Sequence, residues 1–125
     1  MATIERFEDI EAWQRAREIT KRVYRVSSNG SFAKDFALVN QIRRAAVSIP
    51  SNIAEGQGRL SRGEFKQFLG HARGSVFELE SQILIARNLG YLNLEDAAAL
   101  IERITEIGKL LNGLLKSLDR EFTSN

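Results

Sequence analysis

Apolar residues recur along most of the chain at alternating intervals of three and four, the spacing that places them on one side of an α-helix. The clearest run begins in the middle of the sequence and comprises Phe65, Leu69, Ala72, Val76, Leu79, Ile83 and Ala86. A later run comprises Leu100, Ile104, Ile107, Leu111, Leu114 and Leu118. Two shorter, earlier runs comprise Val39, Ile42, Ala46, Ile49 and Ile53, and Trp13, Ala16, Thr20 and Val23. Strand-like alternation is absent, so the pattern predicts four amphipathic helices, over about residues 8–27, 35–56, 62–89 and 94–120.

Polar and glycine residues fall between these predicted helices. The stretch 27–31 is rich in serine, asparagine and glycine, which favour turns. Ser61 and Glu64 have the spacing of a capping box at the start of the third helix. Gly90 is placed to end that helix, and Asn93 to cap the next one. The connections are therefore short.

Short connections between long helices favour antiparallel neighbours, and steps of three and four favour shallow crossings between them. The sequence contains no internal repeat and no low-complexity segment. We therefore expect an all-α fold, an antiparallel up-down-up-down four-helix bundle, in which residues 1–125 form a single domain.

The composition narrows the class of protein. Hydrophobic residues make up 43% of the chain and charged residues 27%, which is ordinary for a globular protein. No run approaches the roughly 18 apolar residues that span a bilayer, and the first residues are too acidic for a signal peptide. The chain has no cysteine, which excludes disulfides and thiol chemistry. We expect a cytoplasmic protein that has no membrane partner and needs no cofactor.

The segment QIRRAAVSIPSNIAEGQGR, residues 41–59, sets a proline inside a helical pattern. The apolar spacing continues through Pro50, so we expect a kinked helix rather than a helix end. Proline has no amide hydrogen, which leaves the carbonyl of Ala46 without its helical donor. The hydroxyl groups of Ser48 and Ser51 are placed to compensate for it.

A pair of glycines follows at the end of this segment. Gly56 suits a left-handed residue that closes the helix, and Gly58 would loosen the turn after it. A phosphate-binding loop would need a longer glycine motif followed by lysine, directly after a strand, and the chain has neither. A weaker possibility stays open, because Arg59 and Arg62 flank a helix N-terminus, which favours an anion.

Catalytic and metal-binding arrangements are sparse. His71 is the only histidine, and helical spacing places it on a polar stripe with Glu64, Gln67 and Glu78, away from the apolar face. A solvated surface histidine explains this position better than a general base or a metal ligand does. Glu78 and Glu80 point to different faces and form no acid and base pair. We expect neither enzymatic activity nor a metal site.

Two glycines inside the third predicted helix need a separate explanation. Gly70 and Gly74 each cost about 1 kcal/mol of helix stability relative to alanine, so close packing is expected in return. They share a face with Phe77, and we predict that Gly70, Gly74 and Phe77 form a homo-oligomer interface. The alternative is a monomer with a wide core stripe.

Basic charge is concentrated in the middle of the chain. The whole chain has 18 basic and 16 acidic residues, for a net charge of +2. Residues 43–73 hold six basic residues and two acidic ones, or +4, and the six are Arg43, Arg44, Arg59, Arg62, Lys66 and Arg73. We predict that these six bind an RNA or DNA backbone at the hairpin between the second and third helices.

Two alternatives to this prediction stay open. The arginines can simply solvate a helix face or pair with Glu55 and Glu64, in which case the protein is a protein–protein scaffold or accessory subunit. Base readout is not indicated, because aromatic residues near the basic positions are limited to Phe65 and Phe68.

Specific motifs in this sequence resemble a known family, the bacterial 23S ribosomal RNA intervening-sequence proteins. The resemblance rests first on FEDIEAWQ at residues 7–14 and on the long motif at residues 41–59. It continues through EF (64–65), FL (68–69), ARGS (72–75), ELE (78–80) and LGYL (89–92). Ala33 and Phe36 depart from the expected proline and tyrosine, which affects only the start of the second helix.

The resemblance implies a four-helix bundle that assembles into a homopentamer and is similar to the accessory proteins of diversity-generating retroelements, which bind nucleic acid and a reverse transcriptase. For most members of the family the role is unsettled. The family supplies no catalytic residues to transfer, so the basic positions rest on the physical argument alone.

Overall fold

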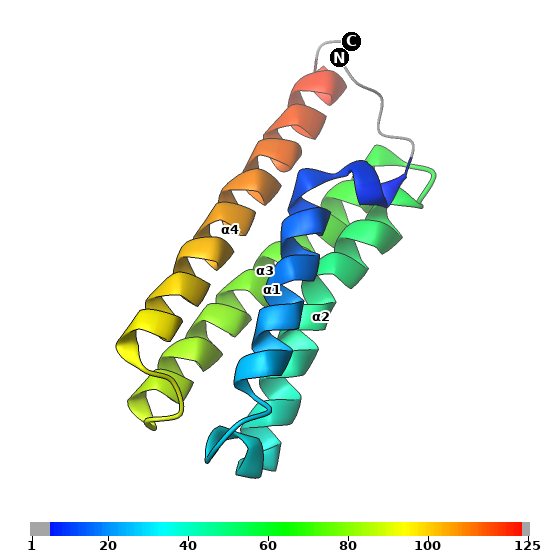
Figure 1. Cartoon of the computed structure of the whole chain (residues 1–125). Helices are drawn as coiled ribbons and strands as arrows, with labels where there is room; N and C mark the ends of the chain where they lie inside the picture. The colour runs from blue at the N-terminus through cyan, green and yellow to red at the C-terminus, as the bar shows by residue number, and fades with distance from the viewer. Residues whose placement is uncertain (1–5, 124–125) are drawn as a thin grey trace.

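The structure, a computed structural model, describes residues 6–123, and side-chain surroundings for residues 6–120 (Figure 1). Within that part the chain is helical and contains no strand. The four long helices are α1 (Glu11–Val26), α2 (Phe36–Gln57), α3 (Arg62–Asn88) and α4 (Leu94–Thr123). Two short 3-10 helices precede α1 and α2, and they are η1 (Phe7–Asp9) and η2 (Phe32–Lys34). The predicted first helix thus divides into η1 and α1.

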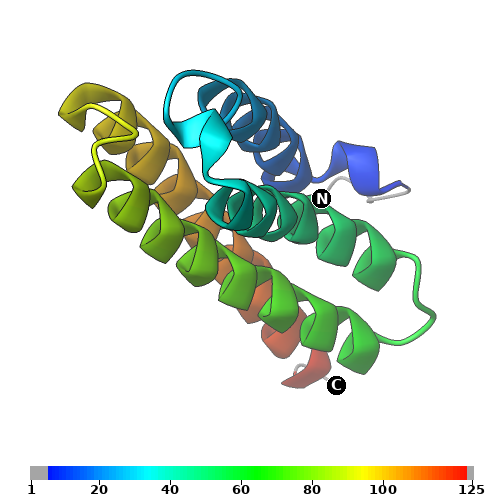
Figure 2. The ribbon, with the colours of Figure 1, turned by 90° about the horizontal axis from the view of Figure 1, so that it is seen from below.

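The helices form an antiparallel bundle, as predicted. The colours in Figure 1 run down α1, up α2, down α3 and up α4. Each helix packs on its neighbour in the sequence, and α4 closes the bundle by packing on α1. Figure 2 shows the same arrangement from below, with α2 between α1 and α3.

The core lies on the apolar faces that the sequence pattern identified. Every residue of the predicted α2 run is buried, and on α3 only Phe65 of the predicted run is partly exposed. On α1 the pattern omitted Ala12 and Ile19, which are both buried. On α4 the run is buried as far as Leu111, and Leu114 and Leu118 pack at the edge of the core.

Helix α2 continues through Pro50, and its missing hydrogen bond is replaced from another helix. The hydroxyl of Thr20 on α1 shares its one hydrogen between two carbonyls, that of Ala16 at 2.7 Å and, more weakly, that of Ala46 at 3.3 Å. Ser48, expected to serve this purpose, instead hydrogen-bonds to Ser75 on α3, at 2.8 Å between the hydroxyl oxygens. The compensation therefore comes from α1.

Gly56 corrects a second expectation about this segment. It lies inside α2, it is buried, and its φ is not positive, so it does not close the helix as a left-handed residue. A Cβ at this position would lie 2.7 Å from the Cβ of Phe68 and 3.0 Å from the ring of Phe65. Gly56 is therefore a point at which α2 and α3 approach closely.

Other turn residues behave as the sequence predicted. The hydroxyl of Ser61 accepts a hydrogen bond from the amide of Glu64, at 3.1 Å, and so caps α3. The side chain of Asn93 accepts one from the amide of Asp96, at 2.7 Å, and so caps α4. Gly90, after the end of α3, has a φ of +80°, which glycine adopts at little cost.

At the lower end of the bundle in Figure 1, the α1–α2 connection contacts the α3–α4 connection. We call this contact, made by Phe32, Asp35 and Tyr91, the latch. The ring of Tyr91, between α3 and α4, stacks on Phe32 of η2 with a centroid distance of 5.2 Å. Its hydroxyl donates to the carboxylate of Asp35, at 2.9 Å. Asp35 also caps α2 by accepting from the amide of Leu38, at 3.1 Å. The hydrogen bond to Asp35 raises the pKa of Tyr91 above 10.0, and desolvation and the negative charge of Asp35 raise it further.

None of the helices in the described residues combines the length and the apolar character needed to cross a membrane.

Candidate nucleic-acid interface

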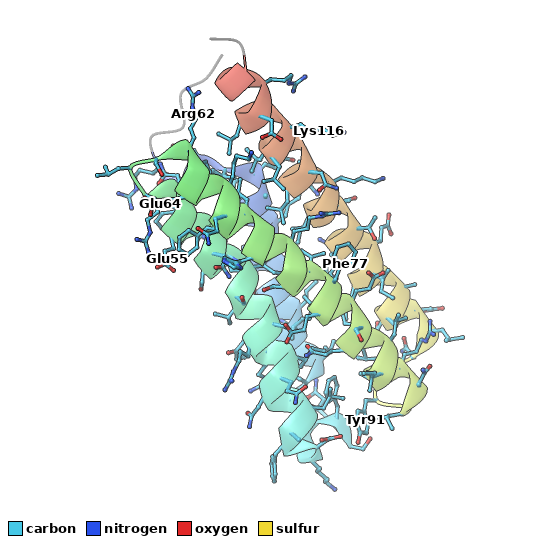
Figure 3. The ribbon with its side chains drawn as sticks, turned by 180° about the vertical axis from the view of Figure 1, so that it is seen from behind. Glu55, Arg62, Glu64, Phe77, Tyr91 and Lys116 are labelled. Carbon is cyan, nitrogen blue, oxygen red and sulfur yellow. The ribbon has the colours of Figure 1, made fainter. Side chains whose placement is uncertain are left out.

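The predicted basic residues at the α2–α3 hairpin are engaged in ion pairs. Arg59 lies 2.9 Å from a carboxylate oxygen of Glu55 and 3.7 Å from one of Glu64, and its guanidinium lies 4.9 Å from the centroid of the Phe68 ring. Lys66 pairs with Asp119 on α4. Figure 3 shows Glu55, Glu64 and the exposed Arg62 together at this end of the bundle. Much of the local positive charge is therefore neutralised within the chain.

Arg43 lies toward the other end of α2. Its guanidinium donates to the hydroxyls of Ser27 and Ser28, at 2.9 Å each, and to the carbonyl of Tyr24 at 3.4 Å. It also lies 4.5 Å from the centroid of the Tyr24 ring. At a rise of about 1.5 Å per residue, Arg43 is roughly 20 Å from the end of α2. Arg43 therefore binds to the C-terminal end of α1, and it does not belong to the predicted site at the α2–α3 hairpin.

The structure separates the six predicted residues into three places. Arg44, beside Arg43, is exposed and forms no ion pair with the described residues. Arg73 lies in the middle of α3, where its guanidinium is 5.6 Å from the centroid of the Phe77 ring. Only Arg59, Arg62 and Lys66 lie at the α2–α3 hairpin.

A second set of cations, separate from the hairpin, lies along the second half of α1, on η2 and in the first half of α2. Arg43 brings α1 and α2 together, and Lys21 and Arg25 are one helical turn apart on α1, as neighbours on its surface. We call this group the α1–α2 basic surface, and it comprises Lys21, Arg22, Arg25, Lys34, Arg43 and Arg44. Residues 19–54 contain these six basic residues and one acidic residue, Asp35, for a net charge of +5.

Within the described residues, none of these six forms an ion pair with a carboxylate. Asp35, the single acidic residue of the segment, is occupied by Tyr91 and by the α2 cap. The charge of the α1–α2 basic surface is thus available to an external anion, in contrast to that of the α2–α3 hairpin. A count of charges over residues 19–54 would have identified it in the sequence.

The residues predicted to form an oligomer interface share an exposed face of α3. A Cβ added to Gly70 or to Gly74 would meet nothing within 4 Å, so neither glycine permits close packing within the chain. Phe77 is 58% exposed, and Ile85, two turns further along α3, is 45% exposed. Figure 3 shows Phe77 midway along this helix. The face carries apolar surface that the chain itself does not cover.

The larger surface hollows lie between helices. One of about 340 Å³ lies between α1 and α4 and is lined by Ile10, Ala12, Leu110 and Leu114 among others. His71 is exposed on α3, with its ring 6.0 Å from that of Phe68. In the described part of the chain, no three histidine, aspartate or glutamate side chains come together as a metal site would require.

Comparison with known proteins gives a consistent result. A sequence model of the family described as "23S rRNA-intervening sequence protein" matches residues 8–113. Comparison with curated proteins gives no match. A crystal structure is similar to this one with a TM-score of 0.78 and 28% sequence identity, over 84% of this chain and 98% of the other. That structure is of a protein of unknown function from the S23 ribosomal protein family of Bacteroides thetaiotaomicron.

The family match covers most of the chain, including the α1–α2 basic surface and the exposed face of α3. It agrees with the four-helix architecture and with the motif at residues 41–59. This chain belongs to the family of 23S rRNA-intervening sequence proteins.

Proposed function

We propose that this protein is a non-enzymatic homo-oligomer that binds the backbone of RNA or DNA, and that the α1–α2 basic surface makes the principal contact. The observation that carries the proposal is that none of the six cations of this surface pairs with a carboxylate of the described chain. The α2–α3 hairpin is the competing site, and its cations Arg59 and Lys66 are already paired.

Counterion release gives the physical reason for this choice. A cation that neutralises a phosphate releases condensed counterions, and each such contact adds about 0.9 to the salt dependence of duplex binding. A cation that already pairs with a carboxylate must keep part of that interaction or give it up when it binds a phosphate. Either outcome reduces the free energy gained from counterion release. The unpaired cations of the α1–α2 basic surface are therefore better suited to bind phosphates.

Self-association would multiply a weak contact. We propose that the α3 face of Gly70, Gly74 and Phe77 is buried against another copy, because it is apolar and uncovered in the single chain. Several identical basic surfaces in one assembly raise the effective concentration of cations along a nucleic acid. The number of five subunits and the relation to accessory proteins of diversity-generating retroelements remain predictions from the family resemblance.

The experiment compares two matched double variants. Lys21→Gln with Arg25→Gln removes two unpaired cations, and Arg59→Gln with Arg62→Gln removes two from the hairpin. Binding to a labelled RNA hairpin and to a DNA duplex is measured by fluorescence anisotropy over a series of salt concentrations. We expect the first variant to bind more weakly, with a salt slope lower by about 2, and the second to bind within about threefold of wild type.

The outcomes distinguish the two candidate sites from each other, and they distinguish nucleic-acid binding from the alternative function. A larger loss in the hairpin variant would assign binding to the hairpin instead. No binding of either probe by the wild-type oligomer at low salt would overturn nucleic-acid binding altogether. In that case the exposed α3 face would favour the alternative, a protein–protein scaffold or accessory subunit.

A further inference from the structure

One aromatic side chain lies inside the α1–α2 basic surface. Tyr24 is 43% exposed although it is a large apolar residue, and it stands one turn after Lys21 and one residue before Arg25. Val47, one turn from Arg43 on α2, is also partly open, at 39%. The basic surface therefore includes apolar area, which simple phosphate binding does not require.

The guanidinium that lies beside the Tyr24 ring is held by a network of hydrogen bonds. Arg43 reaches across from α2 and places its guanidinium 4.5 Å from the centroid of the ring. That guanidinium is fixed in turn by the hydroxyls of Ser27 and Ser28. Ser27 is anchored through its own hydroxyl, which donates to the carbonyl of Val23 at 2.7 Å. The cation beside the ring is therefore fixed before a ligand stacks on the ring, so its ordering adds little to the entropic cost of binding.

We propose that Tyr24 is a stacking platform for an unpaired base, so that the ligand of this surface is a single-stranded stretch or loop of nucleic acid. This inference rests on the proposed function, which it makes more specific. A base within a duplex has both faces covered by its neighbours, whereas an unpaired base can lay one face on an aromatic ring. Lys21 and Arg25 are positioned to hold the phosphates on either side of that base.

The arrangement also explains why the sequence pattern does not place Tyr24 in the predicted site. Tyr24 and Arg43 are 19 residues apart, and they meet only because α1 and α2 are antiparallel. The combination of a planar cation, an aromatic ring and flanking unpaired cations is typical of proteins that bind single strands without reading the sequence.

The test uses the full chain and two labelled RNA probes with equal numbers of phosphates, a single strand without self-complementarity and a blunt duplex. Tyr24→Leu removes the aromatic ring but keeps an apolar side chain, and Tyr24→Phe serves as the matched control. We expect Tyr24→Leu to bind the single strand about 5- to 150-fold more weakly and the duplex as wild type does. The control should bind both probes within about twofold of wild type.

Salt dependence distinguishes stacking from a loss of charge or of fold. Stacking releases no counterions, so Tyr24→Leu should weaken single-strand binding without changing the salt slope. Circular dichroism and light scattering confirm that helicity and assembly are retained. An equal loss for both probes, or no loss for either, would overturn the role of Tyr24 and leave phosphate binding intact. Failure of the wild type to bind either probe would instead overturn the proposed function.

Discussion

At the residue scale, Gly56 shows how one missing methyl group brings two helices together. The nearest atoms to a Cβ at this position belong to Phe65 and Phe68, on the first two turns of α3. Real Cβ atoms essentially never approach another carbon as closely as 2.7 Å, so any larger residue would push α3 away from α2. By contrast, Gly113 on α4 has open space around it.

Gly56→Ala should therefore destabilise the protein although alanine is the better helix former. We expect the free energy of unfolding to fall by about 1–3 kcal/mol, the usual effect of overpacking a core. Gly113→Ala is the control, and it should raise stability by up to about 1 kcal/mol, because it gains helix propensity without a clash. Urea denaturation followed by circular dichroism measures both changes. Equal stabilisation by the two substitutions would show that the α2–α3 contact is not tight.

Sequence reasoning succeeded at residues whose role is local and failed where the partner is remote. Gly90 and Ser61 act on their own helix ends, and both were predicted correctly. The role of Gly56 depends on phenylalanines of the next helix, and a glycine near a helix end looks the same in either role. The carbonyl left free by Pro50 is likewise satisfied by Thr20, 26 residues away from Ala46.

At the element scale, apolar periodicity predicted all four long helices and nearly all of the buried faces. The same periodicity does not say which charged residue meets which, because ion pairs join different elements. Lys66 on α3 pairs with α4, and Arg43 on α2 binds to the end of α1. The candidate site in the structure therefore differs from the predicted one, and only Arg43 and Arg44 belong to both the predicted site and the α1–α2 basic surface.

The latch between the two lower connections gives a pH-dependent contribution to stability. The pKa of Tyr91 is raised in the folded protein, mainly because its hydroxyl donates to Asp35. A raised pKa means that the folded state holds this proton more tightly than the unfolded state. The contribution is therefore complete below about pH 10, and it is lost as the pH rises through the folded pKa.

Comparison with Tyr91→Phe tests this expectation. The variant keeps the stacking on Phe32 but lacks the hydroxyl, so it should be less stable than wild type near neutral pH. The difference between the two proteins should shrink as the pH rises above 10, because the wild-type hydroxyl then loses its proton. Chemical denaturation at a series of pH values measures this difference. A difference that stays constant above pH 10 would contradict the latch.

At the scale of the whole molecule, a charge placed on the exposed α3 face should disrupt self-association. Phe77→Lys puts an ammonium group where the proposed contact would exclude water, so we expect dissociation to a smaller species, seen as a lower mass with unchanged helicity. Light scattering after size-exclusion chromatography measures the mass.

Leu94→Lys is the control for this experiment. Leu94, like Phe77, is a largely exposed apolar residue, but it begins α4 at the lower end of the bundle, away from the middle of α3. We expect its mass to equal that of wild type. Dissociation by Leu94→Lys alone, with Phe77→Lys unchanged, would move the subunit contact to the end of the bundle.

The even number of antiparallel helices has a practical consequence. Helix α1 begins and helix α4 ends at the same end of the bundle, while the loop joining α1 to α2 lies at the opposite end (Figure 1). A fluorescent protein or an affinity tag attached before α1 or after α4 would therefore start from the end of the bundle opposite that loop. Versions tethered in this way for imaging or for immobilisation on a sensor chip should leave the α1–α2 basic surface accessible.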